Sequence, residues 1–357
     1  MATTSTSVPM RQQVEEYINS LQENIVTAFE KLDPNAPQFK RDSWVRTQGG
    51  MGKSCVFASP PDEGATSSSP PTVLEKAGVN ISVVHGTLPP PAIKQMRADH
   101  QSMPLPDRPD GLPFFAAGLS LVIHPRNPHA PTVHANYRYF EITEPASSAD
   151  PDQAEAPKVL AWWFGGGSDL TPSYLYEEDA VHFHKTLQTA CDKHGPQLYE
   201  TFKKWCDEYF FIPHRGESRG IGGLFFDDLN EGPHLRMPSP ASEVKRPVTP
   251  EEIFAFAKEL GNAFVPSYLP ILEIRHSMPY TPHERRWQLV RRGRYVEFNL
   301  VYDRGTKFGL MTPGARIESI LMSLPETARW EYMSELGAEG TEEGKLMEVL
   351  RKPRVWV

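Results

Sequence analysis

The chain has 357 residues, 39% of them hydrophobic and 23% charged, which is the composition of a globular protein. Its net charge of −8 provides no general attraction to nucleic acid or to an anionic membrane surface. No run of about 18 apolar residues occurs, so we expect no integral membrane segment. Three cysteines without a CxxC pair argue against a disulfide framework or a structural zinc site, and they favour a reducing compartment.

Three helical stretches stand out along the chain. Apolar residues recur at steps of three and four between Val14 and Leu32, which predicts a first helix. A second helical stretch covers about 177–210 and is expected to break near Gly195. A third begins at Thr249, which with Pro250 and Glu252 forms a capping box. Before the first helix, residues 1–11 show no signal or transit peptide pattern, and we expect a flexible tail there.

Strands follow one another without the regular strand–helix alternation of a doubly wound sheet. This order favours an antiparallel sheet with flanking helices, an α+β fold, in a single domain over 12–357. The predicted strands are 79–85, 118–124, 132–141, 158–164, 220–226, 294–302 and 306–311. Stretches rich in Pro, Ser and acidic residues predict loop insertions near 58–71, 145–157 and 230–247.

Polar side chains of unusual type share one face of the strand predicted at 132–141. Since side chains alternate along a strand, His134, Asn136 and Arg138 point one way, and Tyr137 points to the core face. A solvent-exposed face would favour Lys, Glu and Thr instead. If the strand pairs with its predecessor, a polar wall results from Ser120, His124, His134, Asn136 and Arg138.

Histidine density suggests a metal site, but other histidines have simpler explanations. His129 lies in a Pro-flanked turn, and His184 is on the inward face of its helix, where a hydrogen-bonded core histidine is the more common case. "GGMGKS" (49–54) lacks the first glycine of a phosphate-binding P-loop and is rejected. Three glycines at 165–167 imply that a ligand or a neighbouring strand approaches the backbone, and Asp169 ends that turn, where it could face the ligand.

Arginines gather in the segment 285–316, which is unusual in an acidic protein. Two interpretations remain open: a basic surface with local salt bridges, or a site for a small, multiply anionic ligand. A hairpin is predicted at "DRGT", with Asp303 and Arg304 at its tip. Arg304 and Arg316 each have the geometry for bidentate contact with a carboxylate.

Five long blocks carry a resemblance to a known family. "SLVIHPRNPHAPTVHANYRYFE" resembles the oxygen-dependent coproporphyrinogen III oxidases, as do "AGVNISVVHG", "WWFGGGSDLTPSYLYEEDAVHFH", "KKWCDEYFFIPHRGESRGIGGLFFDDL" and "RRGRYVEFNLVYDRGTKFGLMTPGARIESILMSLP". The similarity extends from about residue 12 to Val357. It implies an α+β domain with a large antiparallel sheet flanked on both faces by helices, and a homodimer formed through roughly Tyr295–Trp330.

The resemblance also implies a reaction. The ring A and B propionates of coproporphyrinogen III, a tetrapyrrole, are decarboxylated to vinyl groups, giving protoporphyrinogen IX, CO₂ and H₂O₂ in haem biosynthesis. Molecular oxygen is the co-substrate, and we expect no organic cofactor and no metal. A tetracarboxylate substrate would account for arginines gathered in an acidic chain.

Residue roles carry over by position. The resemblance makes His134 the proton donor, and it makes Asp169, Asp303 and Arg304 important for activity. Its substrate contacts are Ser120, Asn136, Tyr137, Arg138, Gly314, Ala315 and Arg316. Histidine, with an ordinary pKa near 6.5, suits proton transfer at neutral pH, and Asp169 or Asp303 is a candidate to anchor or deprotonate the pyrrole N–H groups.

Two other functions are compatible with these residues. Similar bacterial proteins have His124, His134, His184 and His214 as proposed metal ligands, which would suit a metal-dependent oxygenase; four histidines, however, would saturate the metal. A tetrapyrrole carrier without enzymatic activity is the other alternative. A cytoplasmic location is expected, with the mitochondrial intermembrane space as the alternative.

Overall fold

The computed structural model describes residues 8–47, 49–59, 71–99, 105–145, 157–237, 245–311 and 314–357. Its centre is a seven-stranded antiparallel sheet in the order β1-β2-β3-β4-β5-β6-β9. The strands are β1 (Lys40–Val45), β2 (Gly50–Ala58), β3 (Leu74–Leu88), β4 (Leu112–Pro125), β5 (Thr132–Thr143), β6 (Val159–Thr171) and β9 (Gly223–Leu229). A short hairpin, β7 (Phe211–Ile212) with β8 (Glu217–Ser218), stands apart from this sheet.

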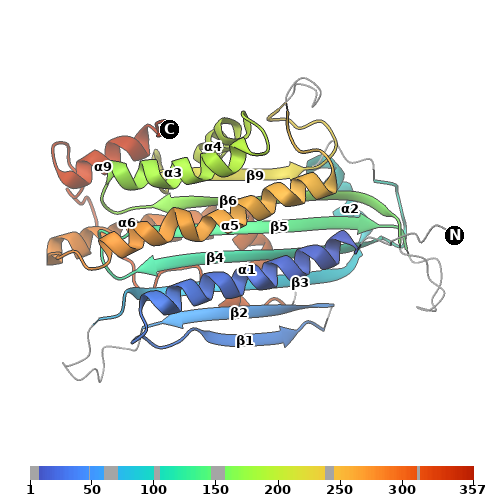
Figure 1. Ribbon diagram of the computed structural model, residues 1–357, viewed down its shortest axis with the longest axis horizontal. Helices are drawn as coiled ribbons and strands as arrows, with labels where there is room; N and C mark the ends of the chain where they lie inside the picture. Colours follow the sequence, from blue (N-terminus) through green and yellow to red (C-terminus); the bar gives the residue numbers. More distant parts are fainter. Residues whose placement is uncertain are drawn as a thin grey trace.

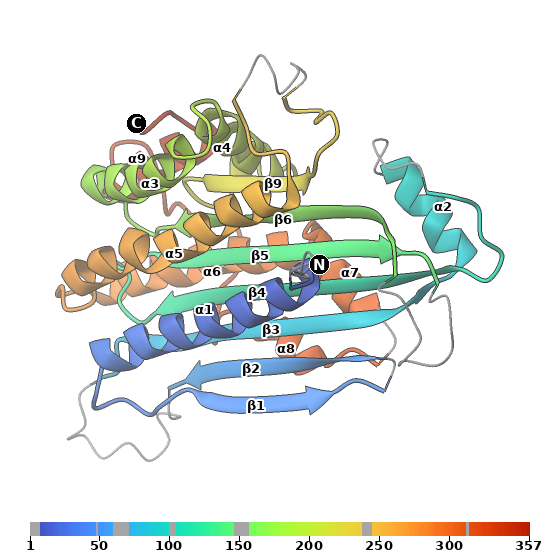
Figure 2. The ribbon, with the colours of Figure 1, turned by 45° about the vertical axis from the view of Figure 1, so that its right-hand side comes forward.

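Helices cover both faces of the sheet (Figures 1 and 2). On one face lie α1 (Met10–Leu32) and α5 (Pro250–Arg275), and beside β9 lie α3 (Glu177–Asp192) and α4 (Leu198–Tyr209). The other face carries α6 (Pro282–Val301), α7 (Arg304–Met311) and α8 (Ile317–Leu321). The remaining helices are α2 (Pro90–Asp99) and α9 (Glu342–Arg351). This arrangement confirms the α+β prediction.

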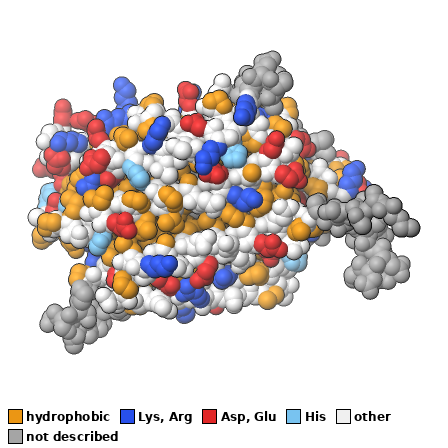
Figure 3. Space-filling model, in the orientation of Figure 1, with side chains coloured by type: hydrophobic (Ala, Val, Ile, Leu, Met, Phe, Trp, Pro, Cys, Tyr) orange, Lys and Arg blue, Asp and Glu red, His pale blue; other side chains and the backbone are white. Residues whose placement is uncertain are grey.

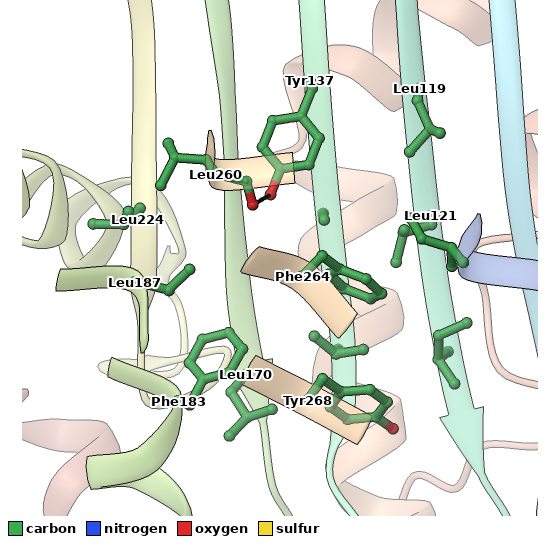
Figure 4. Packing of buried hydrophobic residues seen from close by; sticks show 14 of the residues in the cluster. Leu119, Leu121, Tyr137, Leu170, Phe183, Leu187, Leu224, Leu260, Phe264 and Tyr268 are labelled. Carbon is green, nitrogen blue, oxygen red and sulfur yellow. Dashed lines mark hydrogen bonds between the residues drawn. The ribbon is translucent and has the colours of Figure 1, made fainter. Parts of the chain in front are cut away.

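The main core lies between the sheet and the layer of α1 and α5. Alternate residues of β4 and β5 enter it, among them Leu119, Leu121 and Tyr137, and α5 contributes Phe264 and Tyr268 (Figure 4). Burial of these side chains supplies most of the driving force for the layered packing. On the outer surface of the same layer, hydrophobic side chains gather along and beside α5, between scattered charged groups (Figure 3).

The predicted helices are confirmed. The second stretch is broken into α3 and α4 between Asp192 and Leu198, and α5 begins with the expected capping box. In that box the Thr249 hydroxyl accepts from the Glu252 N–H while the Glu252 carboxylate accepts from the Thr249 N–H. Five of the seven predicted strands are also present, most of them longer than predicted.

The strands predicted at 294–302 and 306–311 are wrong, and no hairpin forms at "DRGT". These residues belong to α6 and α7. Alternating apolar residues suggested a strand, but α6 opens with its own capping box, in which Thr281 and Glu284 exchange hydrogen bonds around Pro282. Once that start is recognised, the buried residues Trp287, Arg291, Tyr295 and Phe298 recur at helical spacing.

Most arginines of the 285–316 segment fasten α6 to the rest of the fold. Glu75 of β3 accepts from both Arg285 and Arg292, and Arg291 pairs with Glu217. Burial would raise the pKa of Glu75, but the charges of Arg292 and Arg285 lower it to about 2. The local salt-bridge interpretation is therefore correct for these arginines, although the pairs are buried instead of solvated.

Some predictions fall largely outside the described residues. The loop insertions near 58–71 and 145–157 do so, as does most of the predicted tail at 1–11, although α1 already begins at Met10. Of the insertion near 230–247, residues 230–237 and 245–247 are described, and they hold no helix or strand apart from an isolated bridge between His234 and Met237. Within the described ranges, no helix combines the length and the apolar character needed to cross a membrane.

Candidate active site

Antiparallel register brings the predicted polar residues into rows across neighbouring strands, on the face that carries α6, α7 and α8. Ser120 of β4 stands opposite Asn136 of β5. His134 stands opposite Asp169 of β6, and Arg138 stands opposite Gly165. The predicted polar wall thus forms because these residues occupy alternate positions of paired strands.

His134 is held by a buried carboxylate. Its Nδ1 lies 2.8 Å from Asp169 Oδ1, and its side chain stays 23% exposed, in contact with the ring of Phe210. A carboxylate next to Nδ1 requires a proton on that nitrogen, which leaves Nε2 as the atom that meets a ligand. This geometry resembles the way an aspartate orients a catalytic histidine in hydrolase triads.

Asp169 is in turn held by Arg219, whose Nη2 lies 2.9 and 2.8 Å from the two carboxylate oxygens. Both side chains are 2% exposed. The Arg219 guanidinium packs against the rings of Phe210, Tyr295 and Phe298, at 4.0, 4.6 and 4.8 Å. A buried charge needs such a partner, so Arg219 and Asp169 form one unit beneath His134.

The surroundings of Asp169 disfavour a role as base. Burial would raise the pKa of its carboxyl, but the charge of Arg219 and the contact with His134 outweigh it and hold the pKa below the ordinary value. A carboxylate with a depressed pKa is a weak base, and this one is turned toward protein partners. Asp169 thus contacts His134 and Arg219 in this structure, a position from which it can orient the His134 ring.

A second charged group lies further along the same strands. Arg138 donates to Asn136 Oδ1 at 2.7 Å and pairs with Asp227 of β9 at 2.9 Å. Asp227 also faces Arg304, which lies at 3.4 Å and is 64% exposed. Burial by itself would lower the pKa of Arg138, but Asp227 raises it above its ordinary value, so the guanidinium stays charged.

Asp303 occupies a structural position next to this group. Its Oδ2 accepts from the Thr306 N–H at 2.6 Å, which caps the start of α7, and its Oδ1 accepts from the Tyr209 hydroxyl at 3.0 Å. The Tyr209 ring in turn lies 5.3 Å below the Arg304 guanidinium. Asp303 therefore places Arg304 at the first position of a helix.

Four of the predicted substrate contacts are not in this group: Tyr137, Gly314, Ala315 and Arg316. The Tyr137 side chain is buried on the core face, where its hydroxyl donates to the Leu260 carbonyl, so only its backbone faces the site (Figure 4). Arg316, which follows Gly314 and Ala315 before α8, pairs with Asp42 and lies over Trp44, both on β1. Arg304 is instead next to β9, at the opposite edge of the sheet.

The four candidate metal ligands do not converge. His124 contacts Thr132 and the Ser323 carbonyl, and His184 contacts Tyr199 and the Ile221 carbonyl. His214 lies against Tyr302 and Glu297. Among the residues that the structure describes, no three His, Cys, Asp or Glu side chains are grouped closely enough to hold a metal ion. His184 is the hydrogen-bonded core histidine that its helix face predicted.

Three residues of this site were missed by sequence reasoning: Arg219, Asp227 and Tyr209. A signal existed for two of them. Arg219 and Asp227 are charged residues on either side of the apolar run "IGGLFF", and a charge next to a buried strand requires a buried partner.

The fold and the site define a class of protein. A histidine oriented by a buried carboxylate, next to half-exposed arginines on one face of an α+β sheet, is suited to binding an anionic organic molecule and transferring a proton to it.

Comparison with known proteins narrows this class to one family. A family model described as coproporphyrinogen III oxidase matches residues 13–356. The chain is 52% identical to the human mitochondrial oxygen-dependent coproporphyrinogen-III oxidase, over 98% of this chain and 67% of the relative. It is 51% identical to the Drosophila melanogaster enzyme (98% and 78%) and 49% identical to the Glycine max chloroplastic enzyme (100% and 81%). The chain belongs to the coproporphyrinogen III oxidase family.

The expected cytoplasmic location is contradicted by these relatives. The human and rat proteins are named mitochondrial, and those of Glycine max and Arabidopsis thaliana are named chloroplastic. Composition and cysteine usage describe the folded domain, whereas a compartment is selected by targeting signals that are read separately. Composition was therefore a poor guide to location.

Proposed function

We propose that this chain catalyses the oxygen-dependent oxidative decarboxylation of the ring A and B propionates of coproporphyrinogen III in haem biosynthesis. Each propionate becomes a vinyl group as CO₂ leaves and two electrons and two protons pass to oxygen, giving H₂O₂. The products are protoporphyrinogen IX, two CO₂ and two H₂O₂. Family membership supports this reaction, because the relatives are named for it.

The single structural observation that supports the proposal is the contact of 2.8 Å between His134 Nδ1 and Asp169 Oδ1. Because Asp169 holds Nδ1, Nε2 is the ring nitrogen left for a substrate, and Arg138 of the same strand supplies positive charge for a carboxylate. We assign His134 as the proton-transferring residue and Asp169, held by Arg219, as its positioning residue. Ser120, Asn136, Arg138 and Arg304 are the proposed substrate contacts.

Oxygen itself is proposed as the oxidant, with no organic cofactor and no metal. The protein's task is then to bind the tetrapyrrole, to exclude water and to move protons. The polar contacts of His124, His184 and His214 within the chain support this view, because each ring is already engaged by protein groups.

The decisive experiment measures vinyl product and H₂O₂ from coproporphyrinogen III with and without oxygen, on protein of measured metal content. We expect turnover only with oxygen, unchanged after exhaustive chelation. His134→Ala should lower kcat by about 10²–10⁴-fold. A tetrapyrrole carrier would bind the substrate yet yield no vinyl product, and loss of turnover on chelation would favour a metal enzyme.

A homodimer through roughly Tyr295–Trp330 is also proposed. The described part of this segment exposes several large apolar side chains, including Phe308 (76%), Met311 (83%) and Trp330 (54%). Exposed apolar groups at this density favour an interface. Sedimentation velocity should give twice the chain mass, and Phe308→Asp with Met311→Lys should shift the species toward the monomer; a wild-type monomer would overturn the assignment.

A further inference from the structure

Asp227 divides its carboxylate between two arginines. Oδ1 lies 2.9 Å from Arg138 Nη2, and Oδ2 lies 3.4 Å from Arg304 Nη2. The Asp227 side chain is 12% exposed, whereas those of Arg138 and Arg304 are 34% and 64% exposed. The carboxylate is therefore the buried part of the group, and the two guanidinium groups are the part that solvent can reach.

The sheet makes room for this contact at one position. Arg138 is on β5 and Asp227 on β9, and β6 runs between them. Gly165 of β6 stands opposite Arg138, and a Cβ there would lie 2.6 Å from Asp227 Oδ1 and 2.8 Å from Arg138 Cζ. A side chain at this position would separate the pair, so the first glycine of the run 165–167 is what lets two strands share an ion pair across a third.

The charges of this group do not cancel. Two guanidinium groups face the one Asp227 carboxylate, so these three groups together carry one positive charge, and the Asp228 carboxylate also acts on Arg138 from nearby. Arg138 also donates to Asn136, and Arg304 packs on Tyr209, so both are restrained. Restrained guanidinium groups bind a carboxylate better than free ones, because less side-chain entropy is lost on binding.

We propose that Asp227 is a positioning residue that holds Arg138 and Arg304 at the spacing at which both donate to one carboxylate of the substrate. The inference rests on the proposed function, since it concerns how the two arginines bind that substrate. Asp227 itself touches no reacting atom; it acts through the two arginines.

Removing the charge of Asp227 separates this role from a purely electrostatic one. Asp227→Asn raises the positive charge near the substrate by one unit. If Asp227 only moderated the local field, an anionic substrate would bind more tightly and KM would fall. If Asp227 positions the arginines, KM rises in spite of the added positive charge.

The experiment is steady-state turnover of coproporphyrinogen III by the full chain, with thermal melting of each variant. We expect Asp227→Asn to raise KM roughly tenfold or more while kcat changes little. Glu208→Gln, which removes an equal charge from the surface pair with Arg236, should leave both constants unchanged. An unchanged or lowered KM in a folded Asp227→Asn protein overturns the proposal.

Two further variants keep the test decisive. Arg304→Ala should also raise KM. The fold-increase in KM that Arg304→Ala causes should be smaller in the Asp227→Asn background than in the wild type, because both residues act on the same substrate contact. Full additivity contradicts the inference. If Asp227→Asn does not fold, Arg304→Ala must raise KM in the wild-type background. The absence of wild-type turnover would instead refute the proposed function.

Discussion

At the scale of single residues, the site depends on buried charges that lie behind the groups meeting the substrate. Asp169 holds His134 Nδ1 and leaves Nε2 for a substrate, and the charge of Arg219 together with the contact to His134 keeps Asp169 ionised. Arg219 is in turn stabilised by the aromatic rings around it. Each member is therefore expected to contribute both to activity and to stability, in different proportions.

Asp169→Asn tests this division. The substitution removes the carboxylate that accepts from His134 Nδ1 and fixes the ring, so kcat should fall by about 10²–10⁴-fold. It also leaves Arg219 buried without an anion, which should lower the free energy of unfolding by about 3–5 kcal/mol. His134→Ala should lower kcat without this loss of stability, as urea titration of both variants would reveal. A kcat for Asp169→Asn within a few-fold of wild type would refute the orienting role.

Two buried histidines predict how stability depends on pH. Burial is the main cause that lowers the pKa values of His124 and His184 to about 3, from an ordinary value of 6.5. Above pH 6.5 both states are neutral at these sites. Between pH 6.5 and 3 only the unfolded state takes up the proton, so stability falls as pH falls, by up to about 1.4 kcal/mol per pH unit for each histidine.

Urea titrations at pH 7, 6 and 5 measure this dependence. His184→Gln keeps a hydrogen-bonding side chain but removes one titrating group, so its stability should vary less steeply with pH than that of the wild type. If the free energy of unfolding changed with pH equally steeply in the two proteins, His184 would not contribute to the pH dependence of stability.

At the scale of elements, the glycine run of β6 shows how one strand allows contact between its neighbours. Gly165→Ala should push Asp227 away from Arg138 and raise KM about tenfold, with a loss of stability of about 1–3 kcal/mol from the overpacked contact. Gly340→Ala is the matched control: its φ of +82° strains an alanine, but no atom lies within 4 Å of the added Cβ. It should lower the melting temperature without changing KM. A normal KM for Gly165→Ala would mean that the ion pair tolerates displacement.

At the scale of the whole molecule, buried ion pairs join α6 to the sheet. Glu75 of β3 binds Arg285 and Arg292, and α6 carries Tyr295 and Asn299 against the Arg219 side of the site. The helix layer and the site are thus coupled through α6.

Glu75→Gln should reveal this coupling. It leaves Arg292 buried without a full negative charge, so the free energy of unfolding should fall by about 3–5 kcal/mol. Glu342→Gln breaks an exposed pair with Lys345 and should change the free energy of unfolding by less than about 1 kcal/mol. Urea denaturation of the two variants gives both values, and similar small losses would show that the buried pair is not needed.

Local patterns in the sequence were sufficient to predict which residues share a strand face and where some of the helices begin. Alternation along 132–141 placed His134, Asn136 and Arg138 on one face, because a strand has a two-residue period regardless of its neighbours. The capping box at Thr249 located α5 in the same way. An equivalent box at Thr281 was present but was outweighed by apolar alternation, so the second half of α6 was predicted as a strand over 294–302.

The partners of each polar residue were decided only by the tertiary structure. Asp169 meets Arg219, and Arg138 meets Asp227, through strands and loops that are between 50 and 89 residues apart in the chain. No local pattern specifies such a contact, since it depends on strand order and register. The same holds for the arginines of α6: the sequence shows how many there are, but only the packed fold shows that most bind carboxylates of the protein and that Arg138 and Arg304 remain accessible to a substrate.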